Sequence, residues 1–352
     1  MSEALRPAAQ RSATLEDVAR VAGVSRATVS RVINGIRNVD PAIQESVRRA
    51  VASTGYVPNG AARSLVTRRA GALALVVSGS GTDGRDEEAG RTQVFTDPFF
   101  GRVVSGVFTG LRPHGVHPVL MLADAPEARE QALSYLKQGN ADGAMVVSTH
   151  ADDPMPGLLL AAGVPTVLFG RPAAPLPVSC VDLANRDGAR LAADHLHARG
   201  RRRVVTIAGP PAVRAARDRL EGFHEAMARH GMPYLPHAEA DFTQAGGERA
   251  MTRLLVEHPD LDGVFAANDL MAQGAVAVLR DHGLRVPEDV AVVGFDDSSA
   301  ATAGRPPLTT VRQPVEEMAA EMARILLDVL ARPGRGATSV IFEPELVVRR
   351  SS

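Results

Sequence analysis

The chain has 352 residues, of which 45% are hydrophobic and 22% are charged, and this composition is typical of an ordinary soluble globular protein. The length is too great for one domain core and indicates two or three domains. No apolar run reaches the roughly 18 residues that a membrane span requires, and the opening segment MSEALRPAAQRS has no apolar signal core. The single cysteine, Cys180, excludes an internal disulfide and a cysteine metal cluster. We therefore expect a cytoplasmic protein with no membrane partner.

The net charge of −1 hides an uneven distribution along the chain. Residues 1–70 contain 11 arginines, no lysine and five acidic residues, a net charge of +6, whereas the rest of the chain carries −7. A small basic head on a large acidic body indicates that only the head meets a polyanion. A solvated basic arm would carry the same charge, so charge alone leaves both interpretations open.

The head begins with signals for three short helices. Thr14 is expected to cap a first helix, with Asp17 as its acidic partner three residues later. Gly23 ends this helix, and Ser25 can cap a second helix from Arg26 to Asn34. A third helix is predicted over residues 41–53. The apolar residues that would pack the three helices together are Leu15, Val18, Ala19, Ala22, Val29, Val32, Ile33, Ile43, Val47 and Val51.

The first two helices, joined by a tight glycine-containing turn, form a helix-turn-helix unit. In such a unit the N-terminal residues of the second helix enter the major groove of DNA. Arginine can donate two hydrogen bonds to guanine, and small or hydroxyl side chains allow close approach or bind phosphate. A plain helical hairpin with a solvated polar face is the alternative. The outward-facing residues of the second helix are Arg26, Ala27, Thr28, Ser30 and Arg31.

The stretch TLEDVARVAGVSRATVSRVINGIRNVDPAIQESVRRAVASTGYVPNGAARSL, without a gap, resembles the N-terminal DNA-binding region of the lactose-repressor/galactose-repressor (LacI/GalR) family. The resemblance implies a disordered N-terminus over 1–13, a helix-turn-helix domain over 14–57, and a hinge helix with its linker over 58–70. It also implies a homodimer on a palindromic double-stranded DNA operator. The DNA-contacting residues that follow are Thr14, Ser25, Arg26, Ala27, Thr28, Ser30, Arg31, Asn34, Asn59, Arg63 and Leu65.

The hinge helix is expected to be too short to be stable on its own. The residue before Pro58 avoids the α region, so the chain there is extended, and a helix as short as residues 60–65 is marginal in isolation. The resemblance implies that this helix forms when two copies meet on DNA. Leu65 would then act as an apolar wedge in the minor groove. A helical linker with Leu65 packed on its own domain is the alternative.

The body, residues 71–352, alternates short apolar runs with amphipathic helical stretches, which predicts an α/β fold of parallel sheets covered by helices. The number of strands favours two lobes with a ligand cleft between them. The expected strands are Ala72–Val77, Pro118–Leu122, Gly143–Val147, Thr166–Phe169, Val204–Ala208, Gly263–Ala266, Val290–Phe295 and Ser339–Val348. The expected helices span 99–112, 126–138, 186–199, 215–230, 244–257 and 269–282.

The body also resembles the periplasmic-binding-protein-like core of the same family, with lobes joined by three crossovers. The resemblance implies a first lobe at about 71–180 and 305–331, and a second lobe at about 181–304 and 332–352. The chain ends soon after its last predicted strand without a leucine heptad tail, so we expect a dimer rather than a larger assembly.

Candidate effector-binding residues follow the predicted strands, where a cleft ligand would lie. Arg219 stands in an R-x-x-G-F helix at the position of the family's effector-contacting arginine, and Asp296 is the strongest acceptor candidate for sugar hydroxyls. The alternatives are core packing for the phenylalanines, loop polarity or helix capping for the small polar residues, and a surface ion pair for Arg219. The full set is Phe99, Phe100, Ser148, Thr149, Arg171, Arg219, Phe242, Asn268 and Asp296.

Because of two differences from the family, the effectors of known members cannot be assumed to bind this chain. Residues 78–96 form a polar, glycine-rich insert that we expect to be a disordered surface loop, and Gly170 stands where several members have an aspartate. We therefore expect a small-molecule effector, with a sugar favoured and a purine or nucleoside as the alternative. The sequence leaves open whether the effector releases DNA or strengthens its binding.

No motif for a phosphate loop, a zinc protease or a hydrolase nucleophile is present. We therefore expect no catalytic residues, no metal and no cofactor, and a regulator rather than an enzyme. A secreted solute-binding protein would share the body fold, but it would need an export signal and no DNA-binding head.

Overall fold

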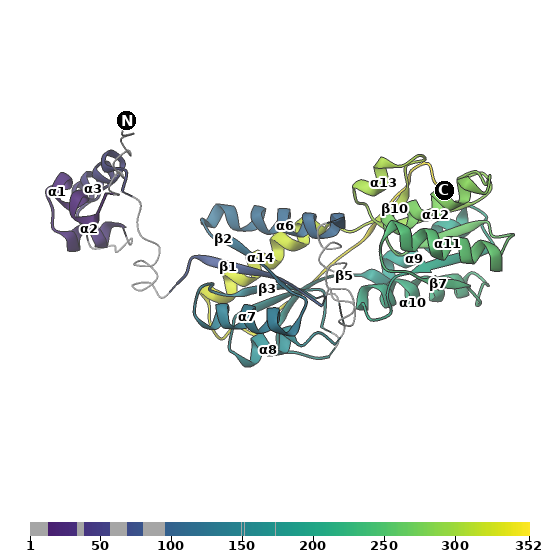
Figure 1. Cartoon of the computed structure of the whole chain (residues 1–352), viewed down its shortest axis with the longest axis horizontal. Helices are drawn as coiled ribbons and strands as arrows, with labels where there is room; N and C mark the ends of the chain where they lie inside the picture. The colour runs from purple at the N-terminus through teal and green to yellow at the C-terminus, as the bar shows by residue number, and fades with distance from the viewer. Residues whose placement is uncertain are drawn as a thin grey trace, which may run out of the picture. The chain divides into compact units, whose positions relative to one another are not determined.

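The computed structural model describes residues 13–33, 39–56, 69–79, 96–148, 150, 152–172 and 174–352. The chain divides between Ala70 and Gly71 into two compact units (Figure 1). The predicted hinge helix, with Asn59, Arg63 and Leu65, lies outside the described residues, as do most of the 78–96 insert and the segment before residue 13.

The smaller unit contains three helices, α1 (Leu15–Ala22), α2 (Arg26–Ile33) and α3 (Pro41–Thr54), close to their predicted bounds. Thr14 and Asp17 form the predicted capping box, in which the Thr14 hydroxyl accepts from the Asp17 amide and the Asp17 carboxylate accepts from the Thr14 amide. Hydrogen bonds to the carboxylate from the Thr14 amide, the Thr14 hydroxyl and Arg20 lower the pKa of Asp17 to about 2. Gly23 ends α1 in the left-handed conformation, with φ of 69°.

The core of this unit is small and apolar. Val18, Val29, Val47 and Ala50, one or two from each helix, are fully buried at its centre. The remaining predicted core residues pack around them, which confirms the predicted three-helix arrangement. Ala50 is an addition that the sequence pattern did not single out.

The larger unit contains two six-stranded sheets, which confirms the predicted α/β fold with parallel sheets (Figure 1). The first sheet has the order β11-β5-β4-β3-β1-β2 and is parallel throughout; in the second, β12-β10-β9-β8-β6-β7, only β12 is antiparallel. The strands are β1 (Ala72–Ser78), β2 (His117–Ala123), β3 (Ala144–Ser148), β4 (Thr166–Phe169), β5 (Ser179–Leu183), β6 (Val204–Ala208), β7 (His237–Glu239), β8 (Gly263–Ala266), β9 (Ala291–Asp296), β10 (Thr309–Arg312), β11 (Ser339–Phe342) and β12 (Glu345–Val347).

Helices cover both faces of each sheet. In β1, Leu73, Leu75 and Val77 face the core under α6 and α14, and the alternate residues Ala74 and Val76 face a separate core under α7 and α8. The helices are α6 (Pro98–Leu111), the 3₁₀ turn η1 (Arg112–His114), α7 (Pro126–Lys137), α8 (Met155–Ala161), α9 (Asn185–Ala198), α10 (Arg214–Arg229), α11 (Gln244–Glu257), α12 (Asp269–Asp281), α13 (Ser299–Ala303) and α14 (Val315–Ala331). None of the described helices is long and apolar enough to cross a membrane.

The limits of the lobes differ from those predicted. Strand β5 belongs to the first sheet, so the chain leaves the first lobe after Leu183, close to the predicted limit of about 180. Strand β10 belongs to the second sheet, so the chain re-enters the first lobe only at α14, not near residue 305. Strand β11 also belongs to the first sheet, so residues 332–342 are not part of the second lobe. The crossovers after β5 and after β11 lie side by side, since the Ala184 amide donates to the Phe342 carbonyl at 2.9 Å.

The single last strand predicted over Ser339–Val348 is wrong. Two strands occupy this stretch, β11 paired parallel with β5 and β12 paired antiparallel with β10 in the other sheet. Pro344 separates them, and because proline has no amide hydrogen it cannot continue a sheet ladder.

Helices α6 and α14 pack at a glycine contact, which allows a stability test. A Cβ atom at Gly106 would lie 2.2 Å from the Glu316 carbonyl oxygen, whereas a Cβ at Gly101 meets no atom within 4 Å. We expect Gly106→Ala to destabilise the larger unit by roughly 1–3 kcal/mol through overpacking. Gly101→Ala, the matched control on the same helix, should be neutral or stabilise by up to about 1 kcal/mol. Thermal unfolding measures both, and equal unfolding temperatures for the two variants would contradict this packing.

Candidate functional site

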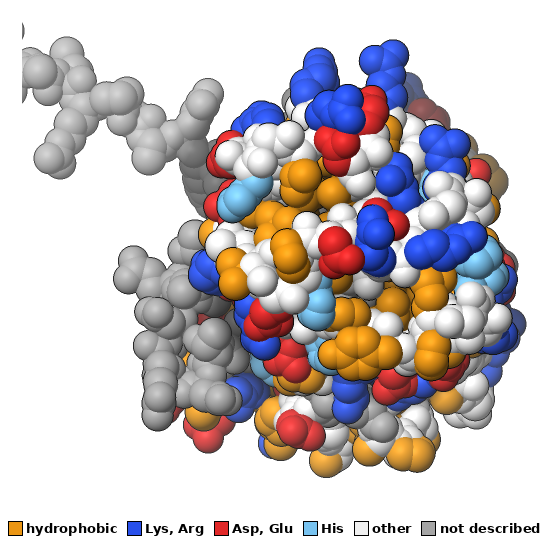
Figure 2. Space-filling view, turned by 90° about the vertical axis from the view of Figure 1, so that its right-hand side faces the viewer, with side chains coloured by type: hydrophobic (Ala, Val, Ile, Leu, Met, Phe, Trp, Pro, Cys, Tyr) orange, Lys and Arg blue, Asp and Glu red, His pale blue; other side chains and the backbone are white. Residues whose placement is uncertain are grey.

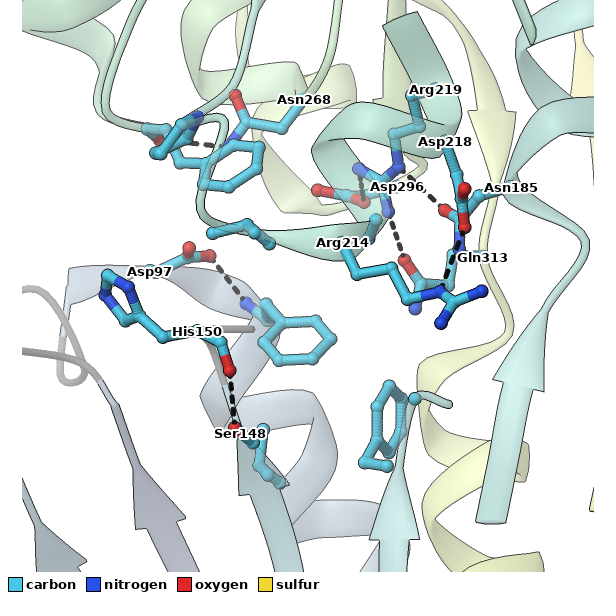
Figure 3. A pocket seen from close by; sticks show the side chains of 18 of the residues that line it. Asp97, Ser148, His150, Asn185, Arg214, Asp218, Arg219, Asn268, Asp296 and Gln313 are labelled. Atoms are coloured by element: carbon cyan, nitrogen blue, oxygen red, sulfur yellow. Dashed lines mark hydrogen bonds and ion pairs between the residues drawn. The ribbon is translucent and has the colours of Figure 1, made fainter. Parts of the chain in front are cut away.

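A cavity of about 620 Å³ lies between the two lobes, at the ends of strands from both sheets (Figure 3). Ser148 ends β3 and Phe169 ends β4 on the first lobe, and Asp296 ends β9 on the second. This is where ligands bind in open α/β sheets. All the described members of the predicted effector set line the cavity, namely Phe99, Phe100, Ser148, Arg171, Arg219, Phe242, Asn268 and Asp296. Thr149 lies outside the described residues.

The first lobe contributes an aromatic wall. The Phe99 ring makes edge-to-face contacts with Phe100 and Phe169, with ring centroids 5.2 and 5.4 Å apart. Phe100 and Phe169 are buried in the core, and Phe99 packs against that core while lining the cavity. The carboxylate of Asp97 accepts from the Phe99 amide at 2.9 Å and caps α6 beside this wall.

Arg219 is the most buried charged side chain of the cavity, with only 5% of the residue exposed, so the surface ion-pair alternative is wrong. Its Nε donates to Asn185 Oδ1 at 2.9 Å and its Nη2 to Gln313 Oε1 at 3.0 Å. Its Nη1 donates to the Ala267 carbonyl at 2.7 Å and to Asp296 Oδ1 at 3.2 Å. The guanidinium carbon also lies 3.7 Å from the centroid of the Phe295 ring.

Asn185 and Gln313 are site residues that sequence reasoning missed. Asn185 follows β5 and Gln313 follows β10, and neither strand was among those predicted. A search for polar residues after every short apolar run, including SCVDL and LTTVR, would have found both positions.

Asp296 is held in an uncommon backbone conformation, with φ of 106°, and its side chain is 14% exposed. Burial raises the pKa of this carboxyl to about 6; Arg219 opposes that shift and the carboxylate of Asp97 adds to it. Behind it, Asp269 is fully buried and accepts from the Ser298 amide and hydroxyl and from the Thr310 hydroxyl. Burial, and then the charge of Asp296, raises the pKa of Asp269 to about 7.

Asn268 and Phe242 are joined by a hydrogen bond at the cavity wall. The Asn268 side chain accepts from the Met271 amide as the cap of α12, and it donates to the Phe242 carbonyl at 2.9 Å. Phe242 has φ of 64°, and its ring lies against Gly209, where a Cβ atom would approach to 2.4 Å. Asn268 therefore has the capping role named as its alternative, and it positions Phe242 at the cavity wall.

The cavity also contains a series of charged pairs, most of whose members the sequence reasoning missed. Each pair has both members on the cavity wall, and the pairs are Arg171 with Asp182 at 2.5 Å, Arg249 with Asp241 at 2.8 Å, and Arg214 with Asp218 at 3.6 Å. With Asp97 and Glu239, carboxylates outnumber arginines among the described lining residues. Arg214 also reaches across the cleft, donating to the Pro172 carbonyl of the first lobe at 2.9 Å.

Gly170, at the position where several family members have an aspartate, lines the cavity from the first lobe. Its φ is 87°, a conformation that a residue with a side chain rarely adopts. The first lobe is not without acceptors, because Asp97 and Asp182 both line the cavity. These two carboxylates therefore supply acceptors on the first lobe although Gly170 has none.

Of the five residues predicted to face outward on α2, three are exposed and two are half-buried. Arg26, Ala27 and Arg31 are exposed on α2, Thr28 and Ser30 are half-buried, and the Ser25 hydroxyl accepts from the Thr28 amide as the cap of the helix. Arg26 forms an exposed ion pair with Glu16 of α1 at 3.0 Å. The hydroxyl of Thr14 is committed to the capping box, and Asn34 lies outside the described residues.

Within the part of the chain that the structure describes, no group of three or more His, Cys, Asp or Glu side chains could hold a metal ion.

Comparisons with known proteins agree with both units. Residues 14–59 match the family described as bacterial regulatory proteins, lacI family, and residues 193–352 match a periplasmic binding protein-like domain. The HTH-type transcriptional regulator CelR of Thermobifida fusca is 45% identical over 347 residues, which cover 97% of this chain and 99% of CelR. The regulator GalR of Escherichia coli (strain K12) is 33% identical over 96% of this chain and 95% of GalR.

Solved structures give the same result. A complex of the regulator CelR with cellobiose has a TM-score of 0.75 and 43% identity, covering 97% of this chain and 100% of that one. A lac repressor dimer bound to operator and the anti-inducer ONPF has a TM-score of 0.82 and 27% identity, covering 97% and 99%. The fold and the site thus define a DNA-binding regulator with a ligand cleft. The chain belongs to the lacI family of bacterial transcriptional regulators, as its N-terminal motifs predicted.

The buried pair of Asp269 and Asp296 gives the stability of the larger unit a predictable pH dependence. The carboxyl of Asp269 ionises near pH 4 in the unfolded chain but only near pH 7 in the folded protein, because burial raises its pKa. The folded state therefore binds more protons between these values, and stability from this group falls as the pH rises from about 4 to about 7. Asp269→Asn keeps an acceptor for Ser298 and removes the charge.

We expect the unfolding temperature of Asp269→Asn, relative to the wild type, to be higher at pH 8 than at pH 5. Thermal unfolding at the two pH values measures this difference, with Asp187→Asn on the exposed face of α9 as the control. A difference that is the same at both pH values would show that Asp269 is already ionised in the folded protein at pH 5.

Proposed function

We propose that the protein is a dimeric regulator that binds a palindromic operator through α2 and the hinge, and that a neutral sugar of disaccharide size in the cleft sets its affinity for DNA. The observation that carries the choice of ligand is the lining of the cavity, where an aromatic wall faces paired carboxylates and guanidinium groups. Such walls suit sugars, whose rings stack on aromatic side chains and whose hydroxyls both donate and accept.

The charge and size of the cavity narrow the ligand class. Carboxylates outnumber arginines on the described wall, and every arginine there already has an aspartate partner, so an anionic ligand such as a sugar phosphate would meet net repulsion. A volume of about 620 Å³ lies well within the range of small-molecule sites and exceeds what one sugar ring fills. The relative CelR was solved with cellobiose, and cellobiose is our first candidate for this chain.

Features of the two units support the proposed dimer and its binding to an operator. Figure 2 shows one face of the larger unit, where basic side chains are interspersed with acidic ones and no broad basic surface is visible. The basic excess lies in residues 1–70, where Arg26 and Arg31 are exposed on α2. On the first lobe, Phe108 of α6 and Leu120 of β2 are 53% and 47% exposed, and we propose that a second copy covers them.

The same proposal gives the protein a regulatory function without catalysis or a cofactor. The matched relatives are transcriptional regulators, and the cavity arginines and aspartates hold one another in place. Since the operator lies on the chromosome, the proposed site of action is the cytoplasm.

Operator binding with and without sugar tests the proposal. The full-length protein first selects a palindromic duplex from a randomised library. Its affinity for that duplex is then measured with cellobiose, glucose, glucose 6-phosphate or guanosine. We expect cellobiose to change the affinity by about 5- to 150-fold, the usual range of allosteric coupling, and glucose 6-phosphate to leave it unchanged. A change in duplex affinity with guanosine alone would favour the purine alternative. Failure to select any duplex would overturn the proposal that the protein is a DNA-binding regulator.

Asp296→Ala tests the acceptor in the cleft. Because a hydrogen bond to a charged group is worth about 1.5–3 kcal/mol, we expect the Kd for cellobiose to rise by about 10- to 150-fold. The variant should still bind the selected duplex without sugar, since the DNA-binding helices lie in the smaller unit and Asp296 lies in the larger one. Calorimetric titration measures the sugar affinity, with Asp187→Ala as the control; an unchanged Kd would remove Asp296 from the binding site.

Arg26→Ala tests the reading helix. A bidentate contact from Arg26 to a guanine predicts a loss of roughly 1–3 kcal/mol at one base position in each half-site, with relaxed specificity there. Competition binding with singly substituted duplexes measures this, and Arg48→Ala on α3 provides the control. A uniform loss across all duplexes would instead make Arg26 a phosphate contact.

A further inference from the structure

Arg102 of α6 connects the first lobe to the floor of the cleft from outside the cavity. Its Nη1 donates to the backbone carbonyl of Asp296 at 2.9 Å and its Nη2 to that of Gln313, also at 2.9 Å. The same guanidinium forms a bidentate pair with Glu316 in the first turn of α14, at 2.8 and 2.7 Å. The side chain of Arg102 is only 18% exposed, whereas that of Glu316 is 42% exposed, so the contacts to the two carbonyls are the better shielded from water.

The two carbonyls belong to residues whose side chains line the cavity. The side chains of Asp296 and Gln313 both accept from Arg219 inside the cleft, while their carbonyls accept from Arg102. Two arginines therefore hold the same two residues, one at the side chains and one at the backbone. Asp296 ends β9 in the second lobe, and Gln313 stands where the chain crosses back to the first lobe.

The backbone of Asp296 is suited to respond to a ligand. Its φ of 106° is strained for a residue with a side chain, and such a conformation persists only when the surroundings hold it. Arg219 and Arg102 supply that hold. A ligand whose hydroxyl donates a hydrogen bond to the carboxylate of Asp296 competes with Arg219 for that contact, and the peptide can then move only together with Arg102.

Helix α6 cannot absorb such a movement locally. At Gly106 and Gly110 it packs directly on α14, and Cβ atoms at these positions would lie 2.2 and 2.9 Å from carbonyl oxygens of α14. A displacement of Arg102 is therefore passed on to α6 and α14 as a packed pair. The exposed side of α6 carries Phe108, part of the face that we propose pairs with a second copy.

We propose that Arg102 is the positioning residue that transmits occupancy of the cleft to the α6–α14 pair, and hence to the DNA-binding units. This inference rests on the proposed function and names the residue by which the cleft acts on DNA. Arg102 touches the backbone of Asp296 and Gln313 rather than the cavity, so its loss uncouples sugar binding from DNA binding while both binding events persist.

The test compares Arg102→Met with a matched control, Arg324→Met. Arg324 forms an equivalent bidentate pair with Glu321 on α14, at 2.7 and 2.6 Å, but it is exposed. For each full-length variant, the Kd for cellobiose and the Kd for the selected duplex are measured, the latter with and without saturating cellobiose. The ratio of the two duplex values is the coupling.

We expect Arg102→Met to bind cellobiose and duplex each within about threefold of the wild type, and to show coupling below about threefold, under the usual range. Arg324→Met should couple like the wild type, and Arg102→Lys, which can keep one of the contacts, should recover part of the coupling. Wild-type coupling in Arg102→Met would overturn the inference. If Arg102→Met does not fold, Arg102→Lys decides, and wild-type coupling there overturns it.

Failure of the proposed function gives a different result. In that case the wild-type protein itself shows no change in duplex affinity with cellobiose, and the variants cannot differ from it. A cellobiose Kd raised well beyond threefold in Arg102→Met, with wild-type coupling once cellobiose is saturating, would make Arg102 a support of the cleft and would also overturn the inference.

Discussion

The buried guanidinium of Arg219 imposes the main constraint on the larger unit. Arginine stays charged in proteins, so a side chain this deeply buried must be surrounded by acceptors. These come from four separate places, Asn185 at the start of α9, Ala267 after β8, Asp296 at the end of β9 and Gln313 after β10. The ends of the second sheet and one crossover are thus fixed around a single cation, and the cleft takes its shape from that arrangement.

The same network gives the cleft both order and sensitivity. Paired arginines and aspartates pre-organise hydrogen-bonding groups, which lowers the entropic cost of binding a polar ligand. The raised pKa values of Asp269 and Asp296 show the cost of gathering carboxylates in a buried place. The strained backbone of Asp296 is tolerated because arginines hold it on both sides. A ligand that competes for these contacts can shift the lobes between two arrangements, as a population shift requires.

The sequence predicted those features that depend on local signals. The capping box of Thr14 and Asp17, the break at Gly23 and the apolar period of each helix are encoded within a few residues, and the structure has them as expected. Arg219 could be found from a short motif, but its partners could not, because Asn185 and Gln313 lie 34 and 94 residues away. Strands β5 and β10 were missed because each mixes polar with apolar residues, as SCVDL and TTVR. The crossover limits were misplaced because a strand's sheet depends on pairing that no local pattern records. Pro344 was the one local sign that the last strand divides.

The central claim is that the cleft and the DNA-binding unit are thermodynamically coupled, and coupling of this kind is reciprocal. The most direct measurement is therefore the Kd for cellobiose of the full-length protein, by titration calorimetry, alone and then saturated with its selected duplex. The account predicts that the duplex changes this Kd by the same factor by which cellobiose changes duplex affinity. An identical cellobiose Kd with and without the duplex would contradict it.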